Sequence, residues 1–365
     1  MKHVLVVNSG SSSVKYKLLD LDSRNVIKAG NIERVTDHTI ALGQMLSELG
    51  DSKPIAVGHR VVHGGSRFSE PTLVDESVLV AIDELSELAP LHNPGNAAGI
   101  RAAMSAYSDL PHVAIFDTAF HQSMPASSYR YAIDRELEEK FKIRRYGFHG
   151  SSYSYVSREA AAMLGIAIEN FNAIILHLGS GASACAIKGG KSFDTSMGFT
   201  PLQGLVMGSR SGDIDPAIVG YLERVAGMNI AEVDDSLNKH AGLKGMTGAA
   251  DLRDVESSAE AGDKNAQEAI AVYVQRIKHY VGAYLAELGR VDALVFTAGV
   301  GENSDVIRAA VLDGLDGLGF ELDGELNSQR SKLSREISTA SSKVRVLVVP
   351  TDEEFEIAVQ AAQFA

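Results

Sequence analysis

Apolar runs of strand length alternate with polar turns and helical periodicities along the whole chain. The first run, residues 4–7, ends at a turn over residues 8–13, and an alternating segment over 14–18 follows. This pattern predicts two strands joined by a tight turn that is rich in small hydroxyl side chains. Backbone N–H groups and hydroxyls of such a turn converge on an anion, and Lys15 adds a positive charge. The segment is therefore predicted to be a phosphate-binding hairpin, with an ordinary polar-tipped hairpin as the alternative.

A second copy of this arrangement lies about half a chain later. Residues 172–178 form another apolar strand, residues 179–183 a Gly- and Ser-rich turn, and residues 184–188 a second strand. Two such units, one in each half, predict a duplicated domain with nucleotide held between the copies. This is the actin/Hsp70/sugar-kinase architecture, in which each half is a ribonuclease-H-like α/β unit with the active-site cleft between the two domains. Chance recurrence of Gly- and Ser-rich turns is the alternative.

The remaining pattern is that of an α/β fold with mostly parallel strands. Further strands are expected at 54–62, 112–116, 293–297 and 344–349, and helices at 77–89, 96–107, 151–164, 265–288 and 305–312. Ser151 or Ser152 is expected to cap its helix, and Thr351 with Glu354 fits a capping box. We expect an N-terminal domain over 1–121 plus 355–365 and a nucleotide-binding domain over 122–354.

Composition and charge narrow the class of protein. The 365 residues are 45% hydrophobic, which suits a soluble protein of two domains. The net charge of −13 argues against nucleic acid or an anionic membrane as a partner. Apolar runs are only strand-sized, so neither a signal peptide nor a transmembrane helix is expected. Cys185 is the single cysteine and has apolar neighbours, which predicts a buried thiol in a reducing cytoplasm.

Charged residues gather where strands end, which is where ligands bind in open α/β sheets. Arg60 stands inside the apolar strand GHRVVHGG. A buried arginine is costly unless an anion pairs with it, and that anion is either a ligand or Asp117 in a purely structural ion pair. Both residues end strands that are expected to converge on one cleft.

Three further segments are candidates for ligand contact, each with a plainer alternative. Residues 299–303 (GVGEN) follow a buried strand and precede a helix, which favours anion binding, although a plain turn also fits. Arg210 stands in a loop of small residues, where exposure to solvent or a pair with Asp213 is the alternative. His149 stands at a helix start, where a neutral capping imidazole is the alternative.

Together these strings resemble acetate kinase, and the resemblance runs from end to end. The strings that carry it are, in order, VLVVNSGSSSVKYKL, GHRVVHGG, APLHNPGN, IFDTAFHQSMP, RRYGFHGSS, HLGSGAS, DTSMGFTPLQGLVMGSRSGDIDP, VFTAGVGENS and PTDEE. The resemblance implies a cytoplasmic homodimer that transfers the γ-phosphoryl group of Mg-ATP to a short carboxylate, with Mn²⁺ able to replace Mg²⁺. It also implies that ATP/ADP and acetate/acetyl phosphate are the substrates.

The resemblance assigns roles to the matching positions of this chain. It makes Asp117, His149, Arg210 and Arg60 catalytic, and it places Mg²⁺ on Asn8 and Glu353. The acetate pocket would be formed by Arg60, Val62, Leu91, Phe148 and Pro201. The nucleotide would be contacted by Ser11, Ser12, Ser13, Lys15, His177, Leu178, Gly179, Ser180, Gly181, Asp251, Leu252, Arg253, Gly299, Val300, Gly301, Glu302 and Asn303.

Phosphoryl transfer explains these residue types on chemical grounds. It needs in-line positioning and positive charge at the equatorial oxygens, which Arg60, Arg210, His149 and Mg²⁺ provide. Mg²⁺ takes only one or two protein oxygens, as Asn8 and Glu353 would supply. A carboxylate nucleophile is already ionised at neutral pH and needs no general base. We therefore expect Asp117 to orient Arg60 or a metal-bound water.

The chain departs from the family strings at several places. Ser180 replaces Asn, Ala182 replaces Ser, Tyr153 replaces His, Leu252 replaces Phe, and Gly95 replaces Pro. The changes at 180 and 182 lie near the expected phosphate contacts and bear on nucleotide preference. None removes a catalytic candidate, so an active enzyme is expected.

Two rival functions stay open from the sequence. A propionate or other short-chain carboxylate kinase differs from an acetate kinase by a methylene, worth about 1–3 kcal/mol in a pocket. A nucleotide-gated switch of the Hsp70 or actin type needs a peptide-binding domain or filament contacts, and the chain ends soon after the helix that starts near Glu353. Formation of an acyl phosphate separates these classes.

Overall fold

The computed structural model describes residues 2–10, 13–35, 37–50 and 52–365, which form two compact units. Unit 1 comprises Met1–Gln122, Phe148–Tyr155 and Asp352–Ala365, and unit 2 comprises Ser123–Gly147 and Val156–Thr351. These units are defined by contacts within the structure. The domain boundaries predicted from the sequence stay a prediction.

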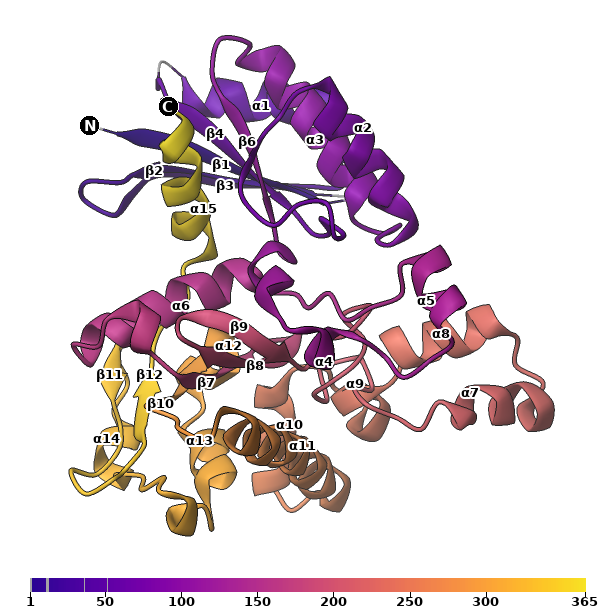
Figure 1. The fold of residues 1–365 in the computed structure, drawn as a ribbon, viewed down its shortest axis with the longest axis vertical. Helices are drawn as coiled ribbons and strands as arrows, with labels where there is room; N and C mark the ends of the chain where they lie inside the picture. The colour runs from indigo at the N-terminus through magenta and orange to yellow at the C-terminus, as the bar shows by residue number, and fades with distance from the viewer. Residues whose placement is uncertain (1, 11–12, 36, 51) are drawn as a thin grey trace. The chain divides into compact units, whose positions relative to one another are not determined.

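Unit 1 is built on a six-stranded sheet (Figure 1). Its strand order is β3-β2-β1-β4-β6-β5, with bounds β1 His3–Ser9, β2 Ser13–Asp20, β3 Asn25–Glu33, β4 Ala56–Val61, β5 Thr72–Leu73 and β6 His112–Phe116. The first three strands form an antiparallel meander, β1, β4 and β6 run parallel, and β5 pairs antiparallel at the edge. The first predicted hairpin is therefore confirmed.

Unit 2 repeats this sheet strand for strand. Its order is β9-β8-β7-β10-β12-β11, with bounds β7 Ala173–Leu178, β8 Ala182–Lys188, β9 Lys191–Thr195, β10 Ala293–Thr297, β11 Arg335–Glu336 and β12 Arg345–Val348. The meander β7-β8-β9, the parallel trio β7-β10-β12 and the antiparallel edge strand β11 match unit 1 in direction. The predicted duplicated α/β fold is confirmed.

Helices cover both faces of the unit 1 sheet (Figure 1). Helices α1 (His38–Leu49), α2 (Glu76–Glu84) and α3 (Asn93–Ala106) cover one face, and α15 (Glu353–Ala361) covers the other. The alternation of side chains along β1 explains this division, because Leu5 and Val7 pack toward α1 and α3 while Val4 and Val6 pack against α15. Asn8 follows Val6 by two residues, so it falls on the α15 face at the carboxyl end of β1.

Unit 2 is richer in helices. Its longest helix is α11 (Lys264–Leu288), whose buried stripe includes Tyr273, Ile277, Val281 and Tyr284, as the helical periodicity predicted. The other helices that lie wholly or partly in unit 2 are α4 Ala126–Tyr129, α5 Arg135–Phe141, α6 Gly150–Met163, α7 Ala217–Tyr221, α8 Ile230–Lys239, α9 Gly242–Thr247, α10 Leu252–Glu260, α12 Ala298–Asn303, α13 Asp305–Leu312 and α14 Gly324–Ser328. Short 3₁₀ turns at Leu85–Glu87, Ala119–Ser123, Ile168–Asn170, Asp316–Leu318 and Ala362–Phe364 and a π-helical turn at Leu222–Ala226 complete the chain.

Two predicted helix caps are wrong. Helix α6 begins one residue before Ser151, so Ser151 and Ser152 lie inside its first turn. Helix α15 is capped by Asp352, whose carboxylate accepts a backbone N–H of the first turn, and Thr351 precedes the cap. Both errors have one cause, since several polar residues stand side by side and only the backbone dihedrals decide which of them caps.

The thiol of Cys185 is fully buried in β8, as predicted. Burial raises the pKa of this thiol well above its ordinary value. Within the described residues, none of the helices combines the length and the apolar character that a membrane span requires.

Three buried histidines lie in or beside strands β4 and β6 of unit 1. His59 Nε2 lies 2.9 Å from His112 Nδ1, and His112 Nε2 lies 3.0 Å from the Tyr107 carbonyl oxygen. A carbonyl only accepts, so His112 donates to it, and His59 must then donate to His112. Burial lowers the pKa of His59 and His112, and it lowers that of His63 to about 4. All three are therefore neutral in the folded protein near pH 7.

Acid is expected to destabilise the fold through these histidines. The unfolded chain takes up protons near pH 6.5 but the folded histidines do not, so the free energy of unfolding falls as pH drops below 6.5. The slope is at most about 1.4 kcal/mol per pH unit for each histidine. Urea unfolding midpoints at pH 7.5 and 5.0 measure this. The variant His59→Leu should reduce the difference between the two midpoints. The control His240→Gln, at an exposed histidine, should leave that difference unchanged. Equal pH dependence in the His59→Leu variant would contradict the assignment.

Candidate active site

Three charged side chains meet at the carboxyl ends of the unit 1 strands. Arg60 is the penultimate residue of β4, Asp117 follows β6, and Glu353 begins α15. The Arg60 guanidinium donates two hydrogen bonds to the Asp117 carboxylate, from Nε to Oδ1 at 3.0 Å and from Nη2 to Oδ2 at 2.8 Å. Asp117 is almost fully buried, whereas a quarter of the Arg60 side chain is exposed. The ion pair foreseen as the plainer alternative thus exists, and the Arg60 side chain stays partly exposed.

Glu353 lies at the rim of this pair. Its Oε2 is 3.8 Å from Arg60 Nη2, and this oxygen is buried yet accepts no hydrogen bond from any described residue. Burial raises the pKa of Glu353, although the charge of Arg60 opposes the rise. A buried carboxylate oxygen without a donor is a natural ligand for a cation.

Two asparagines of the NPGN string, whose roles the sequence did not reveal, hold the strand ends beside this group. Asn96 Oδ1 accepts from the Val62 backbone N–H at 3.1 Å, and its Nδ2 donates to the Ser9 carbonyl at 2.6 Å. Asn93 binds both the N–H and the carbonyl of His63. One buried residue of α3 thus ties the end of β1 to the chain that leaves β4.

His149 and Phe148 lie next to Asp117 through the chain that enters α6. The Gly150 backbone N–H donates to the Asp117 carbonyl at 2.9 Å, and a Cβ at Gly150 would collide with that carbonyl, so the close approach requires glycine. His149 has a φ of +60°, a conformation that non-glycine residues rarely adopt. Phe148 is buried, and its carbonyl accepts from His121 Nε2 at 2.8 Å. Strained backbone of this kind concentrates at functional sites.

The other predicted residues of unit 1 are placed as follows. Val62 directly follows β4, and Leu91 lies in a loop with 70% of its side chain exposed.

Lys15 is an exposed residue of β2, paired in register with Asn8 of β1. Ser13 begins β2 and accepts the Gly10 N–H through its carbonyl. The predicted contacts of Ser11 and Ser12 fall outside the described residues.

In unit 2, Arg210 lies beside Pro201. Its Nη1 donates to the Pro201 carbonyl at 2.7 Å, and burial lowers its pKa. The alternative of a pair with Asp213 is wrong, because that carboxylate accepts from the Tyr280 hydroxyl at 2.7 Å and faces Arg276 at 3.7 Å. Within the described ranges, Arg210 has no carboxylate at ion-pair distance. A partly buried cation in this state favours an anionic ligand.

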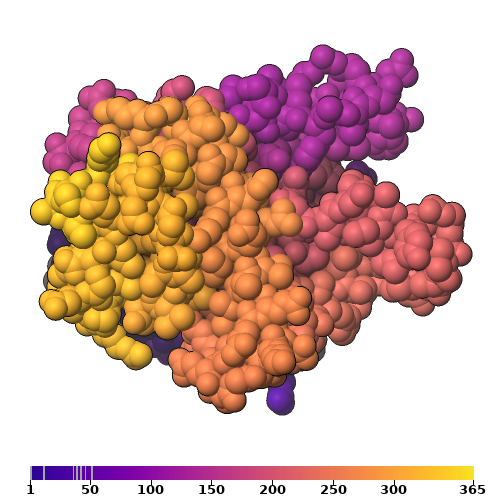
Figure 2. Space-filling model, turned by 90° about the horizontal axis from the view of Figure 1, so that it is seen from below, coloured from indigo at the N-terminus to yellow at the C-terminus, as the bar shows by residue number. Residues whose placement is uncertain are grey.

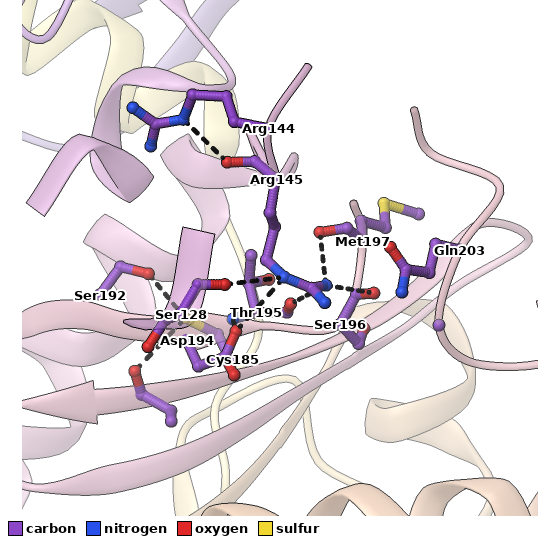
Figure 3. Close-up of polar contacts among 12 residues, drawn as sticks. Ser128, Arg144, Arg145, Cys185, Ser192, Asp194, Thr195, Ser196, Met197 and Gln203 are labelled. Carbon is purple, nitrogen blue, oxygen red and sulfur yellow. Dashed lines mark hydrogen bonds and ion pairs between the residues drawn. The ribbon is translucent and has the colours of Figure 1, made fainter. Parts of the chain in front are cut away.

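Arg145 anchors the segment that leads to Pro201 (Figure 3). Its Nη1 donates to the consecutive carbonyls of Thr195, Ser196 and Met197, at 2.7, 3.1 and 3.3 Å. Its Nε lies 3.6 Å from Asp194 Oδ1, and burial raises the pKa of that aspartate. A planar guanidinium thus orders the chain after β9, a role that sequence reasoning missed.

Two predicted nucleotide segments, residues 177–181 and 299–303, lie at the carboxyl ends of β7 and β10. His177 and Leu178 end β7, and the turn Gly179–Ser180–Gly181 joins it to β8, with the Gly179 N–H donating to the Gly181 carbonyl at 3.1 Å. The Ser180 carbonyl accepts from the Gly208 N–H at 3.0 Å, which brings the Arg210 loop against this turn. His177 pairs in register with Thr297, the residue before α12.

The segment Gly299, Val300, Gly301, Glu302 and Asn303 is helix α12 and not the turn that the sequence predicted. Its two glycines suggested a turn, but they lie in helical backbone. Asp251 caps α10 through its carboxylate, which also binds the Arg253 guanidinium at 3.0 and 2.5 Å. Leu252, expected beside the adenine, is buried.

Comparison with known proteins identifies the family. The acetokinase family model matches residues 31–359. The chain belongs to the acetokinase family. Its relatives include an acetate kinase of Clavibacter sepedonicus, 51% identical over 99% of this chain and 98% of the relative. Solved structures include a Porphyromonas gingivalis acetate kinase (TM-score 0.97, 40% identity) and a Francisella tularensis propionate kinase (TM-score 0.93, 39% identity), each aligned over 100% of both chains.

Acetokinase family membership confirms the resemblance recognised in the sequence. It makes the protein a kinase that transfers phosphate to a carboxylate. The rival interpretation as an Hsp70- or actin-type switch is thereby set aside.

Proposed function

We propose that this protein catalyses the reversible, Mg²⁺-dependent transfer of the ATP γ-phosphoryl group to acetate, giving acetyl phosphate and ADP by direct in-line transfer. The family supports this reaction, and relatives about half identical in sequence carry the name acetate kinase. The observation that carries it is the cluster of Arg60, Asp117 and Glu353, which offers a guanidinium to an anion beside a buried carboxylate oxygen that accepts no hydrogen bond from the described residues.

Arg60 binds the acetate carboxylate or the phosphoryl group in this proposal. Its Nε and Nη2 are committed to Asp117, while Nη1 donates no hydrogen bond to any described residue. Val62, Leu91, Phe148 and Pro201 wall the methyl group. His149 and Arg210 stabilise the transferred phosphoryl group, whose equatorial oxygens gain from fixed donors.

The residues present fit a magnesium ion. Glu353 Oε2 is buried and accepts no hydrogen bond from the described residues, and Asn8 falls on the same sheet face, so these two are the proposed ligands. Mg²⁺ often binds through one or two protein oxygens, which agrees with the absence of a cluster of three or more metal-binding side chains in the described part of the chain. When bound, the ion neutralises phosphate charge. Mn²⁺, which also favours oxygen ligands, is proposed to substitute.

Glu353→Gln is expected to raise the Mg²⁺ concentration needed for half-maximal activity by about 10-fold or more, because the amide removes the anionic ligand. Titration of activity with Mg²⁺ at saturating ATP and acetate measures this. Glu354→Gln is the matched control, since Glu354 instead faces Lys17 at 3.3 Å. Unchanged Mg²⁺ dependence in the Glu353 variant would contradict the metal assignment.

Asp117→Asn is expected to lower kcat/KM for acetate by about 100-fold without changing the shape of the pH profile. The carboxylate holds Arg60 with two hydrogen bonds, and acetate needs no base because it is ionised well below neutral pH. Profiles of kcat from pH 5.5 to 8.5 measure this. The orienting role is overturned if wild-type kcat falls below neutral pH with a pKa that Asp117→Asn abolishes while the affinity for Mg²⁺ stays constant.

The nucleotide is proposed to bind along unit 2. Its contacts are His177, Leu178, Gly179, Ser180, Gly181, Asp251, Leu252, Arg253, Gly299, Val300, Gly301, Glu302 and Asn303, together with Ser11, Ser12, Ser13 and Lys15. The convergence of the β7–β8 turn with α12 supports this assignment.

A propionate kinase is the second candidate, because a propionate kinase structure matches the chain almost as well as an acetate kinase structure. Trapping acyl phosphate with hydroxylamine, with acetate, propionate and butyrate in parallel, tests both. Hydroxamate formed at the highest kcat/KM with acetate supports the proposal, and a higher value with propionate supports the alternative. Loss of ATP that does not depend on any carboxylate would reject both.

We further propose that the protein is a cytoplasmic homodimer that does not bind nucleic acid, as its net charge of −13 suggests. Three apolar side chains at helical spacing are 40% to 65% exposed and form a stripe: Ile218, Tyr221 and Val225. Figure 2 shows the α7–α8 segment projecting from the rest of unit 2. Sedimentation at twice 38.9 kDa supports a dimer. A species of single-chain mass at micromolar concentration rules it out.

A further inference from the structure

Arg308 of α13 is the largest side chain among those that are fully buried, with 1% of its surface exposed. Its guanidinium donates four hydrogen bonds, all to protein oxygens. Nη1 reaches the carbonyls of Gly301 and Glu302 at 2.9 and 3.0 Å. Nε and Nη2 reach the side-chain and main-chain oxygens of Asn327 at 2.7 and 2.8 Å. The guanidinium therefore links the last turn of α12 to α14.

Helix α12 needs such a link. It has only six residues, two of its interior residues are glycine, and its first residue, Ala298, has a φ of +63°. A helix this short is not stable alone, and an alanine in left-handed backbone is strained. The free carbonyls at its carboxyl end carry partial negative charge, which a buried guanidinium stabilises.

The far end of the link is itself fixed. Asn327 is 4% exposed, and its Nδ2 donates to the Asp305 carbonyl at 3.0 Å, at the start of α13. Arg308 makes no ion pair with a carboxylate within the described ranges. Burial lowers the pKa of Arg308 to about 10, so the side chain stays charged near pH 7.

A buried cation that has no carboxylate partner carries a large desolvation penalty. An apolar side chain of similar volume would fill the same space without the desolvation cost, so the guanidinium is explained by the carbonyls that it holds. Two of those carbonyls belong to the segment proposed to contact the nucleotide. Arg308 lines a small polar cavity that Arg335 also lines, but Arg335 Nη1 donates to the Ser331 carbonyl and not to α12.

We propose that Arg308, held by Asn327, is a positioning residue that fixes α12 for nucleotide binding. This inference rests on the proposed function and deepens it, since it adds to the nucleotide site a residue that acts through the Gly301 and Glu302 carbonyls. Its removal is expected to weaken nucleotide binding and to leave acetate binding unchanged, because none of the residues proposed to contact acetate lies in α12, α13 or α14.

The test compares Arg308→Lys, Arg308→Met and Asn327→Ser with the control Arg335→Lys. Initial rates with ATP and acetate varied separately, ADP binding by calorimetry and thermal unfolding are measured for each. We expect the KM for ATP and the Kd for ADP to rise at least 10-fold in the first three variants, with the KM for acetate changed less than twofold. Arg335→Lys should stay within twofold of wild type in both.

A purely structural role has a different signature. It would lower the melting temperature and the active fraction, hence kcat, with the KM for ATP unchanged, and that result overturns the proposal. If Arg308→Met does not fold, Arg308→Lys and Asn327→Ser still decide it. If the wild-type protein forms no hydroxamate, the proposed function fails, whereas ADP binding by the same variants still tests Arg308.

Discussion

Arg60→Gln is expected to lower kcat/KM for acetate by about 10³-fold and to raise the KM for acetate. The substitution removes the cation that is proposed to bind the substrate carboxylate. It also leaves the buried Asp117 carboxylate without its two hydrogen bonds, which are 3.0 and 2.8 Å long. Loss of a single fixed donor to a developing charge costs about 10²–10³ in rate, and an unpaired buried carboxylate adds to that cost. Steady-state kinetics in the hydroxamate assay measure the effect.

Arg101→Gln is the matched control, because Arg101 pairs with Asp83 on the exposed surface of the same unit. Such a pair contributes at most about 1 kcal/mol to stability and nothing to the reaction. In Arg60→Gln, activity falls both because the cation is lost and because the Asp117 carboxylate is left unpaired. The double variant Arg60→Gln/Asp117→Asn separates these two causes, since it removes the unpaired carboxylate charge. If Arg60→Gln turned over at the wild-type rate, Arg60 would not be part of the active site, and the proposed site would lose its central residue.

The sequence predicted best the features that depend on local pattern. Two hairpins, the long helix α11 and the placement of Arg60 and Asp117 at strand ends all follow from hydrophobic periodicity and from the rule that ligands gather at carboxyl ends. The duplicated sheet follows from the repeat of the hairpin. These are properties of short segments or of a general topology.

Features that depend on contacts between distant segments could not be predicted. Asn96 ties Ser9 to Val62, across 87 and 34 residues of sequence, and no local pattern marks it for that task. Arg308 is one basic residue within an ordinary amphipathic helix, and only its burial against α12 shows what it binds. The helical state of α12 was missed because its glycines favour a turn unless the surroundings hold the helix.

Arg210→Gln is expected to lower kcat and kcat/KM together by about 10²–10³-fold, with little change in the KM for either substrate. Arg210 has its Nη1 fixed by the Pro201 carbonyl at 2.7 Å, and no described carboxylate neutralises it. We expect it to meet the charge that develops on the phosphoryl group in the transition state, and the loss of such an interaction lowers kcat without affecting ground-state binding.

Arg210→Lys separates charge from geometry, since lysine keeps the charge but loses the fork that the Pro201 carbonyl orients. It should recover no more than about a tenth of wild-type kcat. Arg135→Gln is the control, because Arg135 is an exposed residue of unit 2 that pairs with Glu139. If Arg210→Gln instead raised the KM for acetate with kcat preserved, the guanidinium would bind the ground-state carboxylate, and its proposed role at the phosphoryl group would be wrong.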